Sequence, residues 1–224
     1  GRVVRALRRR GKYLLFECDD SHLIVHLGMS GSLRLLPRDA PPGKHDHVDL
    51  LFADRVLRLH DPRRFGAVLW TQQPLETHPL IRHLGVEPLS RSFNAAQLHA
   101  LTQGHRTAIK NVLMDARGIV GVGNIYASES LFLAGINPRT PARRLSRARC
   151  ARLVVAIKHT LRTAIRAGGS SLRDFVRSDG TPGHFQLRAR VYGRAGEACR
   201  RCEGTVRRIV QGQRATYYCP RCQR

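Results

Sequence analysis

Four cysteines near the C-terminus form two close pairs in the spacing Cys199-x2-Cys202-x16-Cys219-x2-Cys222. Four thiolates on two tight turns suit the tetrahedral coordination of structural zinc, and the residues between the pairs are numerous enough for a hairpin that brings them together. The alternative is a pair of disulfides, but nothing else in the chain is typical of a secreted protein. The spacing therefore predicts a ribbon that holds one structural Zn²⁺ ion.

The predicted ribbon is rich in arginine. A small cationic hairpin of this kind is suited to contact with a phosphate backbone. Its arginines are Arg200, Arg201, Arg207, Arg208, Arg214 and Arg221. We therefore expect the ribbon to bind nucleic acid, with Arg214 at the tip of the hairpin.

The whole chain of 224 residues carries a formal charge of +23, and 42% of its residues are hydrophobic. This composition predicts a globular core, and the charge favours nucleic acid or an anionic membrane surface as partner. No apolar run is long enough to span a bilayer, no signal peptide is visible, and the basic segment 146–167 has the pattern of a packed helix. Nucleic acid is therefore favoured, and we expect a cytoplasmic protein whose thiols stay reduced.

The elements that must position these groups change in type along the chain. Short β-rich segments between polar turns predict antiparallel strands at 13–18, 22–27, 32–36, 48–52, 56–60 and 67–70. Helical patterns follow at 94–103, 106–116, 124–134, 146–167 and 172–177. The predicted fold class is α+β, with an antiparallel sandwich or barrel-like domain, a helical domain and a zinc ribbon. The predicted limits are 1–72 for the β domain, 73–92 for a hinge, 93–186 for the helical domain and 187–224 for the ribbon.

A glycine-rich turn, Gly121-Val122-Gly123, precedes Asn124, which we expect to be the N-cap of the third helix. Backbone N–H groups at such a helix start make an anion site, and glycine lets a ligand approach closely. Glycine turns before helices are common, so this turn alone is weak evidence for an anion site. The preceding helix, which carries Lys110, makes the interpretation more specific. The two helices and the double turn between them are predicted to hold one phosphate.

The stretch 121–138, GVGNIYASESLFLAGINP, resembles the helix–two-turn–helix motif of the formamidopyrimidine-DNA glycosylase/endonuclease VIII family. The ribbon beginning at Val191 is similar to the zinc finger of that family. The segments KYLL, HLGMSGSL, KHDHVDL and DPRRFG, which begin at Lys12, His26, Lys44 and Asp61, match in the same order. Met29 and the DPRRFG loop favour the formamidopyrimidine branch.

The resemblance implies roles for individual residues. Met29, Arg63 and Phe65 resemble the wedge that fills the duplex when a damaged nucleotide is flipped out, with Arg63 bonding to the orphaned opposite base. Lys12 is implied to lie near the reacting sugar, where a cation binds phosphate or shuttles protons. Arg214 is implied to clamp the phosphates beside the lesion and to assist the second elimination. Further DNA contacts are implied for His45, His105, Arg106, Lys110 and Asn124.

Several of these residues have plainer interpretations. Met29 suits a core position as well as an exposed loop, and Lys12 suits a solvated strand end. His45 and His47, two residues apart on a strand, have the spacing of metal ligands, but no third ligand is evident nearby. The loop 178–183 resembles the lid that covers the extruded base.

Members of the family begin with Pro-Glu. The secondary amine of that proline attacks the sugar C1′ and expels the base, and the resulting Schiff base permits strand cleavage while the glutamate handles protons. This sequence begins with Gly1. Two explanations stay open: the sequence is a fragment of a complete enzyme, or it is a truncated protein that lacks the family's leading helix and first strands and has lost the nucleophile.

The resemblance implies a base-excision repair glycosylase with abasic-site lyase activity. Its substrates would be the oxidised purines 8-oxoguanine and formamidopyrimidines in duplex DNA, and we expect a monomer at the bacterial nucleoid. One alternative is a catalytically inactive zinc-ribbon module that recognises damaged or abasic DNA. Another is an RNA-binding ribbon of the translation apparatus, although the chain lacks an aromatic platform for stacking bases.

Overall fold

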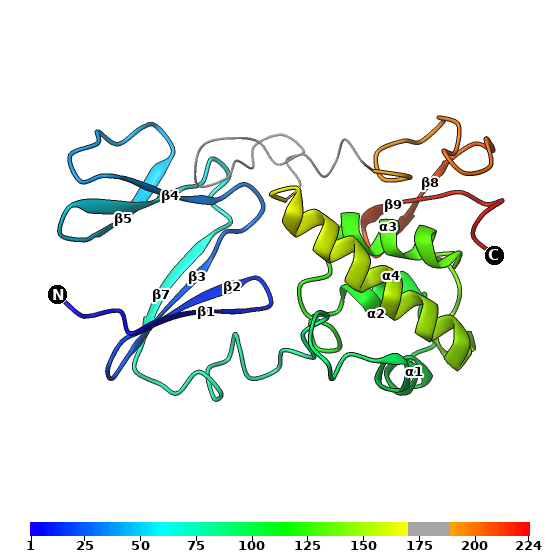
Figure 1. The fold of residues 1–224 in the computed structure, drawn as a ribbon, viewed down its shortest axis with the longest axis horizontal. Coiled ribbons are helices and arrows are strands. Elements are labelled where there is room, and N and C mark those ends of the chain that lie inside the picture. The colour runs from blue at the N-terminus through cyan, green and yellow to red at the C-terminus, as the bar shows by residue number, and fades with distance from the viewer. Residues whose placement is uncertain (170–188) are drawn as a thin grey trace. The chain divides into compact units, whose positions relative to one another are not determined.

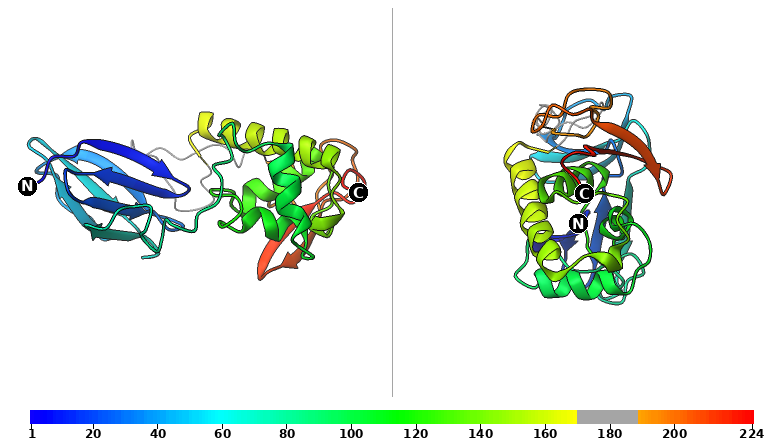
Figure 2. Two further views of the ribbon diagram at one scale, coloured as in Figure 1. Left: turned by 90° about the horizontal axis from the view of Figure 1, so that it is seen from below. Right: turned by 90° about the vertical axis from the view of Figure 1, so that its right-hand side faces the viewer.

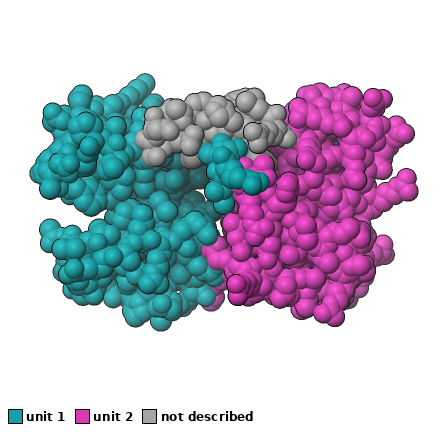
Figure 3. Space-filling model, in the orientation of Figure 1, with its two compact units in different colours: residues 1–82, 164–187 teal, residues 83–163, 188–224 magenta. Residues whose placement is uncertain are grey.

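The computed structural model describes residues 1–169 and 189–224, which lie in two compact units (Figures 1 and 3). Unit 1 comprises Gly1–Arg82 and Ala164–Leu187, and unit 2 comprises His83–Thr163 and Arg188–Arg224. The helix predicted at 172–177 and the loop 178–183 lie outside the described residues. None of the helices that can be described has the length and apolar character needed to cross a membrane.

Unit 1 contains two antiparallel sheets (Figure 1). Strands β1 (Ala6–Arg10), β2 (Tyr13–Glu17), β3 (His22–His26) and β7 (Ala67–Thr71) form one sheet in the order β1-β2-β3-β7. Strands β4 (Ser32–Pro37), β5 (Asp46–Leu51) and β6 (Arg55–His60) form the other in the order β4-β6-β5. The six predicted strands are confirmed with small shifts at their ends. Strand β1 was not predicted, because the residues of this edge strand are mostly exposed and three of the five are arginines.

Buried apolar side chains from both sheets supply the interior of unit 1. The buried members are Leu15, Phe16, Ile24, Val25, Val56 and Leu59. One buried cation accompanies them, since the Arg58 guanidinium donates to both carboxylate oxygens of Asp49 at 2.7 and 2.8 Å. The loops of unit 1 therefore begin and end on strands that are held by a packed interior and by the Arg58–Asp49 ion pair.

Unit 2 is helical and carries the ribbon. Helix α1 (Ala95–Gln103) begins after Asn94, whose side chain accepts the Gln97 N–H at 3.0 Å as an N-cap. The other helical elements are α2 (Ile109–Met114), α3 (Asn124–Ala134), the short 3-10 helix η1 (Ala142–Arg144) and α4 (Arg147–Arg166). Their apolar faces meet in one core that includes Phe93, Leu113, Leu131, Leu153 and Ile157. The predicted combination of β domain, helical domain and ribbon is confirmed.

The ribbon is a hairpin of β8 (Arg207–Gln211) and β9 (Arg214–Tyr218). Gly212 and Gln213 form its two-residue turn with φ of 53° and 60°. Two positive φ values define a type I′ turn, whose twist matches that of the strands it joins. Phe132 of α3 packs against Val191, Val206 and the cysteines at the base of the ribbon, so a separate small core joins the ribbon to α3.

Candidate nucleic-acid interface

The two cysteine pairs of the ribbon come together as predicted. The Sγ atoms of Cys199 and Cys222 are 3.9 Å apart and those of Cys202 and Cys219 are 3.5 Å apart, with all four within 4.8 Å of one another. A tetrahedral zinc with Zn–S bonds of about 2.3 Å requires sulfur separations of roughly 3.8 Å, whereas a disulfide requires about 2 Å. The geometry fits one structural zinc and excludes the disulfide alternative.

Two thiols of the cluster, those of Cys202 and Cys222, have pKa values shifted in opposite directions. The Gly204 backbone N–H bonds to Cys202 and lowers the pKa of that thiol to about 7. Burial, followed by hydrogen bonds from the neighbouring cysteines, raises the pKa of Cys222. Four thiolates so close together repel one another, and a bound zinc ion offsets that repulsion and favours their deprotonated forms.

Lys110 is at the centre of the contact between α2, α3 and the hairpin. Its side chain is fully buried, with 0% exposure. The ammonium donates to Asn124 Oδ1 at 2.5 Å, to Thr216 Oγ1 at 2.7 Å and to the Ala215 carbonyl oxygen at 3.4 Å. Burial, followed by the nearby charge of Arg214, lowers the pKa of Lys110 to about 8. Lys110 therefore holds strand β9 in place instead of facing solvent.

Asn124 is the first residue of α3, so the prediction that it caps this helix is wrong. The N-cap is Gly123, and no side chain caps this helix start. The Asn124 amide nitrogen donates to the Ala215 carbonyl oxygen at 2.9 Å and to the Tyr192 hydroxyl at 3.2 Å. The side chain is thus engaged with the ribbon, and the backbone at this helix start is the part of the motif left for the predicted anion contact.

The other predicted DNA contacts of unit 2 lie around this network. Arg214 is the exposed first residue of β9 and pairs with Gln211 across the turn. Arg106 is exposed in the loop between α1 and α2, and His105 beside it is half-buried, with its carbonyl oxygen accepting the Arg143 N–H at 3.1 Å. Unit 2 thereby combines two exposed guanidinium groups with an uncapped helix start.

A buried carboxylate that the sequence analysis did not single out joins the ribbon to α3. Glu129 is 3% exposed and accepts the backbone N–H groups of Arg190, Val191 and Tyr192 at 2.9, 2.9 and 2.8 Å. The sequence signal was a lone acidic residue within the otherwise uncharged helix 124–134. Glu129 fixes the point at which the chain enters the ribbon.

In unit 1, the three predicted wedge residues are exposed on two loops. Met29 is 66% exposed in the turn after β3, and Phe65 is 56% exposed in the loop before β7. The guanidinium carbon of Arg63 lies 4.9 Å from the centroid of the Phe65 ring, which is cation–π distance. The exposure of Met29 excludes its interpretation as a core methionine.

Lys12 lies in the turn between β1 and β2, where its side chain is exposed. Burial lowers the pKa of His26, and the charge of Lys12 contributes to this shift, which places the two groups near each other. His26 Nδ1 in turn accepts the Gly28 N–H at 3.0 Å, at the start of the Met29 turn. Lys12 therefore belongs to the same surface region as one of the wedge loops.

His45 and His47 do not form a metal site in the structure. His45 precedes β5 and packs edge-on against His60, with ring centroids 5.9 Å apart. His47 Nε2 donates to the Asp61 carbonyl oxygen at 3.0 Å. Across residues 1–169 and 189–224, the four cysteines are the one group of three or more side chains placed to hold a metal ion.

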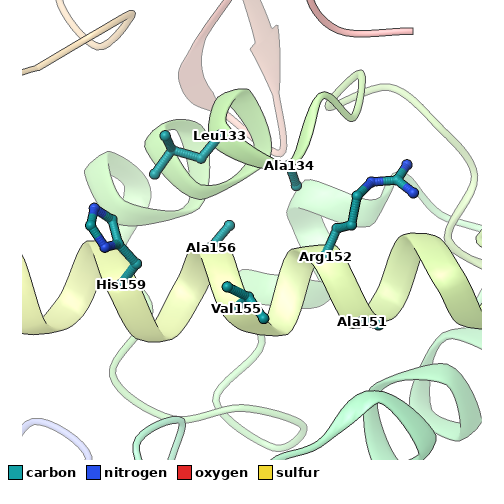
Figure 4. Close-up of a pocket in the computed structure, with 7 residues that line it drawn as sticks. All are labelled: Leu133, Ala134, Ala151, Arg152, Val155, Ala156 and His159. Carbon is teal, nitrogen blue, oxygen red and sulfur yellow. The ribbon is translucent and has the colours of Figure 1, made fainter.

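A shallow groove of about 500 Å³ lies between α3 and α4 (Figure 4). It is lined by Leu133, Ala134, Ala151, Arg152, Val155, Ala156 and His159. Within unit 2, α4 runs along one side while the β8–β9 hairpin projects from the other (Figure 2, left). The groove is therefore not part of the candidate interface.

Exposed apolar side chains beside a guanidinium, two helices joined by a double turn and a cysteine cluster that fits zinc are together typical of proteins that bind and distort duplex DNA. Family models agree: the formamidopyrimidine-DNA glycosylase N-terminal domain matches residues 1–68, the H2TH domain of that glycosylase matches 84–176, and the zinc finger found in FPG and IleRS matches 196–224. The formamidopyrimidine-DNA glycosylase of Thioalkalivibrio sulfidiphilus is 58% identical over 225 residues, which cover 100% of this chain and 83% of the relative. The chain belongs to the formamidopyrimidine-DNA glycosylase family.

Two solved structures resemble this one closely. The MutM (Fpg) protein of Thermus thermophilus is 40% identical with a TM-score of 0.90, over 100% of this chain and 84% of that one. The Fpg of Lactococcus lactis in complex with DNA that contains an abasic site is 37% identical with a TM-score of 0.89, over 100% and 83% of the two chains.

Proposed function

We propose that this chain is a base-excision repair DNA glycosylase with abasic-site lyase activity that removes oxidised purines from duplex DNA. The observation that carries the proposal is the exposed set of Met29, Arg63 and Phe65 on two anchored loops. Two large apolar side chains in water beside a guanidinium are suited to filling the space that a flipped nucleotide leaves and to bonding with the opposite base. Relatives that are 58% and 57% identical to this chain carry the name of this glycosylase.

The proposed role of unit 2 is to hold the phosphate backbone. Arg214, Arg106 and His105 supply side-chain contacts, and the uncapped start of α3 supplies backbone N–H groups. Lys110 and Asn124 support these contacts indirectly, because their hydrogen bonds fix strand β9, which begins with Arg214. His45 would add a contact from unit 1.

The proposed chemistry follows from the family resemblance. An amine nitrogen bonds to C1′ while the glycosidic bond breaks and the base leaves, and loss of a C2′ proton from the resulting imine then expels the 3′ phosphate. In this proposal Lys12 assists proton transfer or neutralises the departing phosphate, and Arg214 assists the second elimination. We propose that the protein acts at the bacterial nucleoid, where its duplex substrate lies.

The test uses a duplex with one 8-oxoguanine opposite cytosine, incubated with and without borohydride. Two versions of the protein are compared: the chain as printed, and the chain preceded by the N-terminal residues of the Thioalkalivibrio relative. We expect the longer version to form a trapped covalent complex and to cut the strand.

Each outcome has a distinct meaning. Trapping by the printed chain alone would place the nucleophile among its own residues, and Gly1 and Lys12 would be mapped first. Binding of the lesion duplex by both versions without trapping or cutting by either would refute the glycosylase proposal and favour a recognition module.

A further inference from the structure

Asp61 lies directly before the exposed loop of Arg63 and Phe65, yet it is only 2% exposed. Its Oδ1 accepts the hydroxyl of Ser30 at 2.8 Å, and its Oδ2 accepts the backbone N–H of Gly66 at 2.7 Å. Ser30 is itself 2% exposed and follows Met29 directly. One carboxylate therefore bonds to the Met29 turn with one oxygen and closes the Phe65 loop with the other.

The backbone of Asp61 extends these connections. Its N–H donates to the His45 carbonyl oxygen at 2.9 Å, and its carbonyl oxygen accepts the Arg64 N–H at 3.2 Å and the His47 Nε2–H at 3.0 Å. Three segments that are separate in sequence thus meet at one residue. Each segment carries a predicted DNA contact.

The two wedge loops also touch directly through their backbones. Gly28 has a φ of +63°, and a Cβ added there would lie 2.5 Å from the Phe65 carbonyl carbon and 2.7 Å from its oxygen. Only glycine fits such an approach, because any side chain would collide with main-chain atoms that cannot move aside. The Met29 turn and the Phe65 loop are consequently packed against each other at van der Waals distance.

Asp61 is held as an anion. Burial by itself raises the pKa of the carboxyl, but hydrogen bonds from the Gly66 N–H, the Ser30 hydroxyl and the Arg63 N–H outweigh it and leave the pKa below the ordinary value. Hydrogen bonds to a charged acceptor are stronger than neutral ones, so a carboxylate with several donors is a firm anchor.

We propose that Asp61 is a positioning residue that locks the two loops into one rigid wedge and thereby sets the selectivity for duplex containing a lesion. This inference rests on the proposed function. Exposed Met29 and Phe65 side chains gain affinity only if the loops already hold the shape that enters the duplex, because ordering mobile loops on binding costs free energy. Asp61 supplies that order without touching the DNA.

The test measures selectivity, defined as the affinity for a duplex with a tetrahydrofuran abasic analogue opposite cytosine divided by the affinity for the undamaged duplex. Asp61→Asn removes the negative charge, so the two charge-assisted hydrogen bonds from Gly66 N–H and Ser30 become at best neutral ones, and the Ser30 hydroxyl must turn from donor to acceptor. We expect selectivity to fall about tenfold, with little change in affinity for undamaged DNA, since loss of a charged hydrogen bond is worth roughly one to two orders of magnitude. Asp54→Asn, at an exposed turn, is the matched control and should leave selectivity unchanged.

A double-mutant cycle separates positioning from general stability. If Asp61 acts through both wedge loops, Asp61→Asn should cost no further selectivity in a background that already carries Met29→Ala and Phe65→Ala. A 2-aminopurine placed beside the lesion provides a second readout, because its fluorescence rises when the wedge unstacks it, and this rise should shrink in Asp61→Asn.

Ser30→Ala gives an independent check, should Asp61→Asn fail to fold by circular dichroism. It detaches only the Met29 turn, so its effect should disappear in a Met29→Ala background and persist in a Phe65→Ala background. Unchanged selectivity in Asp61→Asn, or effects that simply multiply in the cycles, would overturn the inference. A wild-type chain with no preference for the lesion duplex would instead refute the proposed function.

Discussion

Unit 1 and unit 2 fix their candidate DNA-contacting groups around buried charges of opposite sign. In unit 1 the charge is the Asp61 carboxylate, whose partners Ser30 and Gly66 are nearby loop residues. In unit 2 the charge is the Lys110 ammonium, and its partner Thr216 follows it by 106 residues. A satisfied buried charge holds a loop in one shape, because every alternative leaves the charge without partners.

The difference lies in what each arrangement depends on. The partners of Asp61 belong to the same sheets and loops of unit 1, so unit 1 can order its wedge alone. Two of the three acceptors of Lys110, the Thr216 hydroxyl and the Ala215 carbonyl oxygen, lie on a hairpin whose base is closed by four cysteines, so the unit 2 site depends on the metal. Loss of zinc should therefore disrupt the phosphate-binding site of unit 2 and leave the wedge loops of unit 1 ordered.

The largest expected effect comes from removing a zinc ligand. Cys202→Ser should lose zinc and abolish DNA binding, since structural zinc contributes on the order of 10 kcal/mol to the folding of such a ribbon. Metal analysis measures the loss of zinc, and fluorescence anisotropy with a labelled duplex measures the loss of binding. The β-strand signal in circular dichroism should persist, because most described strands belong to unit 1.

Cys18→Ser is the matched control, because Cys18 lies in unit 1 outside the cluster. It should keep both zinc and affinity. Unchanged metal content and DNA affinity in Cys202→Ser would remove the dependence on zinc that distinguishes the two units.

A smaller effect concerns the titration of Lys110. The chain has four lysines, so a ¹³Cε-lysine spectrum contains four resonances, and one should titrate with a midpoint near pH 8. Between about pH 8 and pH 10.5 the unfolded chain holds a proton at Lys110 that the folded chain has released. The stability of unit 2 should therefore rise with pH across this window, by about 3 kcal/mol in total.

Lys110→Met identifies the resonance by deleting it, and Lys158→Met should leave it in place. Thr216→Val offers a sharper variant, because it removes one acceptor of the ammonium. If no resonance has a midpoint within about one pH unit of 8, the Lys110 ammonium is not desolvated to the degree that its burial implies.

The smallest expected effect is that of Arg214→Ala. Loss of one phosphate contact should weaken duplex binding roughly three- to tenfold and reduce the slope of log affinity against log salt by about 0.9. Arg147→Ala, at the start of α4, is the control and should leave the slope unchanged. An unchanged slope in Arg214→Ala would remove this residue from the interface.

Much of the fold could be predicted because its signals are local. The short β-rich runs of β2, β3 and β6 between polar turns and the spacing of the cysteines are readable over a few residues. Strand β1 escaped prediction because an exposed edge strand has no apolar face to show. The domain limits at 72, 92 and 186 stay predictions.

The sequence predicted which residue types the candidate site contains, but it did not predict their burial or their hydrogen-bond partners. Lys110 was expected to face a phosphate, and its burial arises from Thr216 and Ala215, which no local pattern connects with it. Asn124 has the residue type of an N-cap, but tertiary hydrogen bonds to β9 engage its amide and Gly123 takes the capping position. The roles of Asp61 and Glu129 could not be predicted, because the sequence does not show which carboxylates will accept hydrogen bonds from backbone N–H groups.

The two-residue turn of the β8–β9 hairpin sets a limit on length. Side chains alternate along a strand, so Arg214 and Thr216 share the face of β9 that looks toward Lys110. One inserted residue at Gly212 or Gln213 would shift the pairing and turn Ala215 and Tyr217 to that face. Lys110 would lose its hydroxyl acceptor and the guanidinium would point elsewhere. Insertions and deletions should therefore be excluded from this tip.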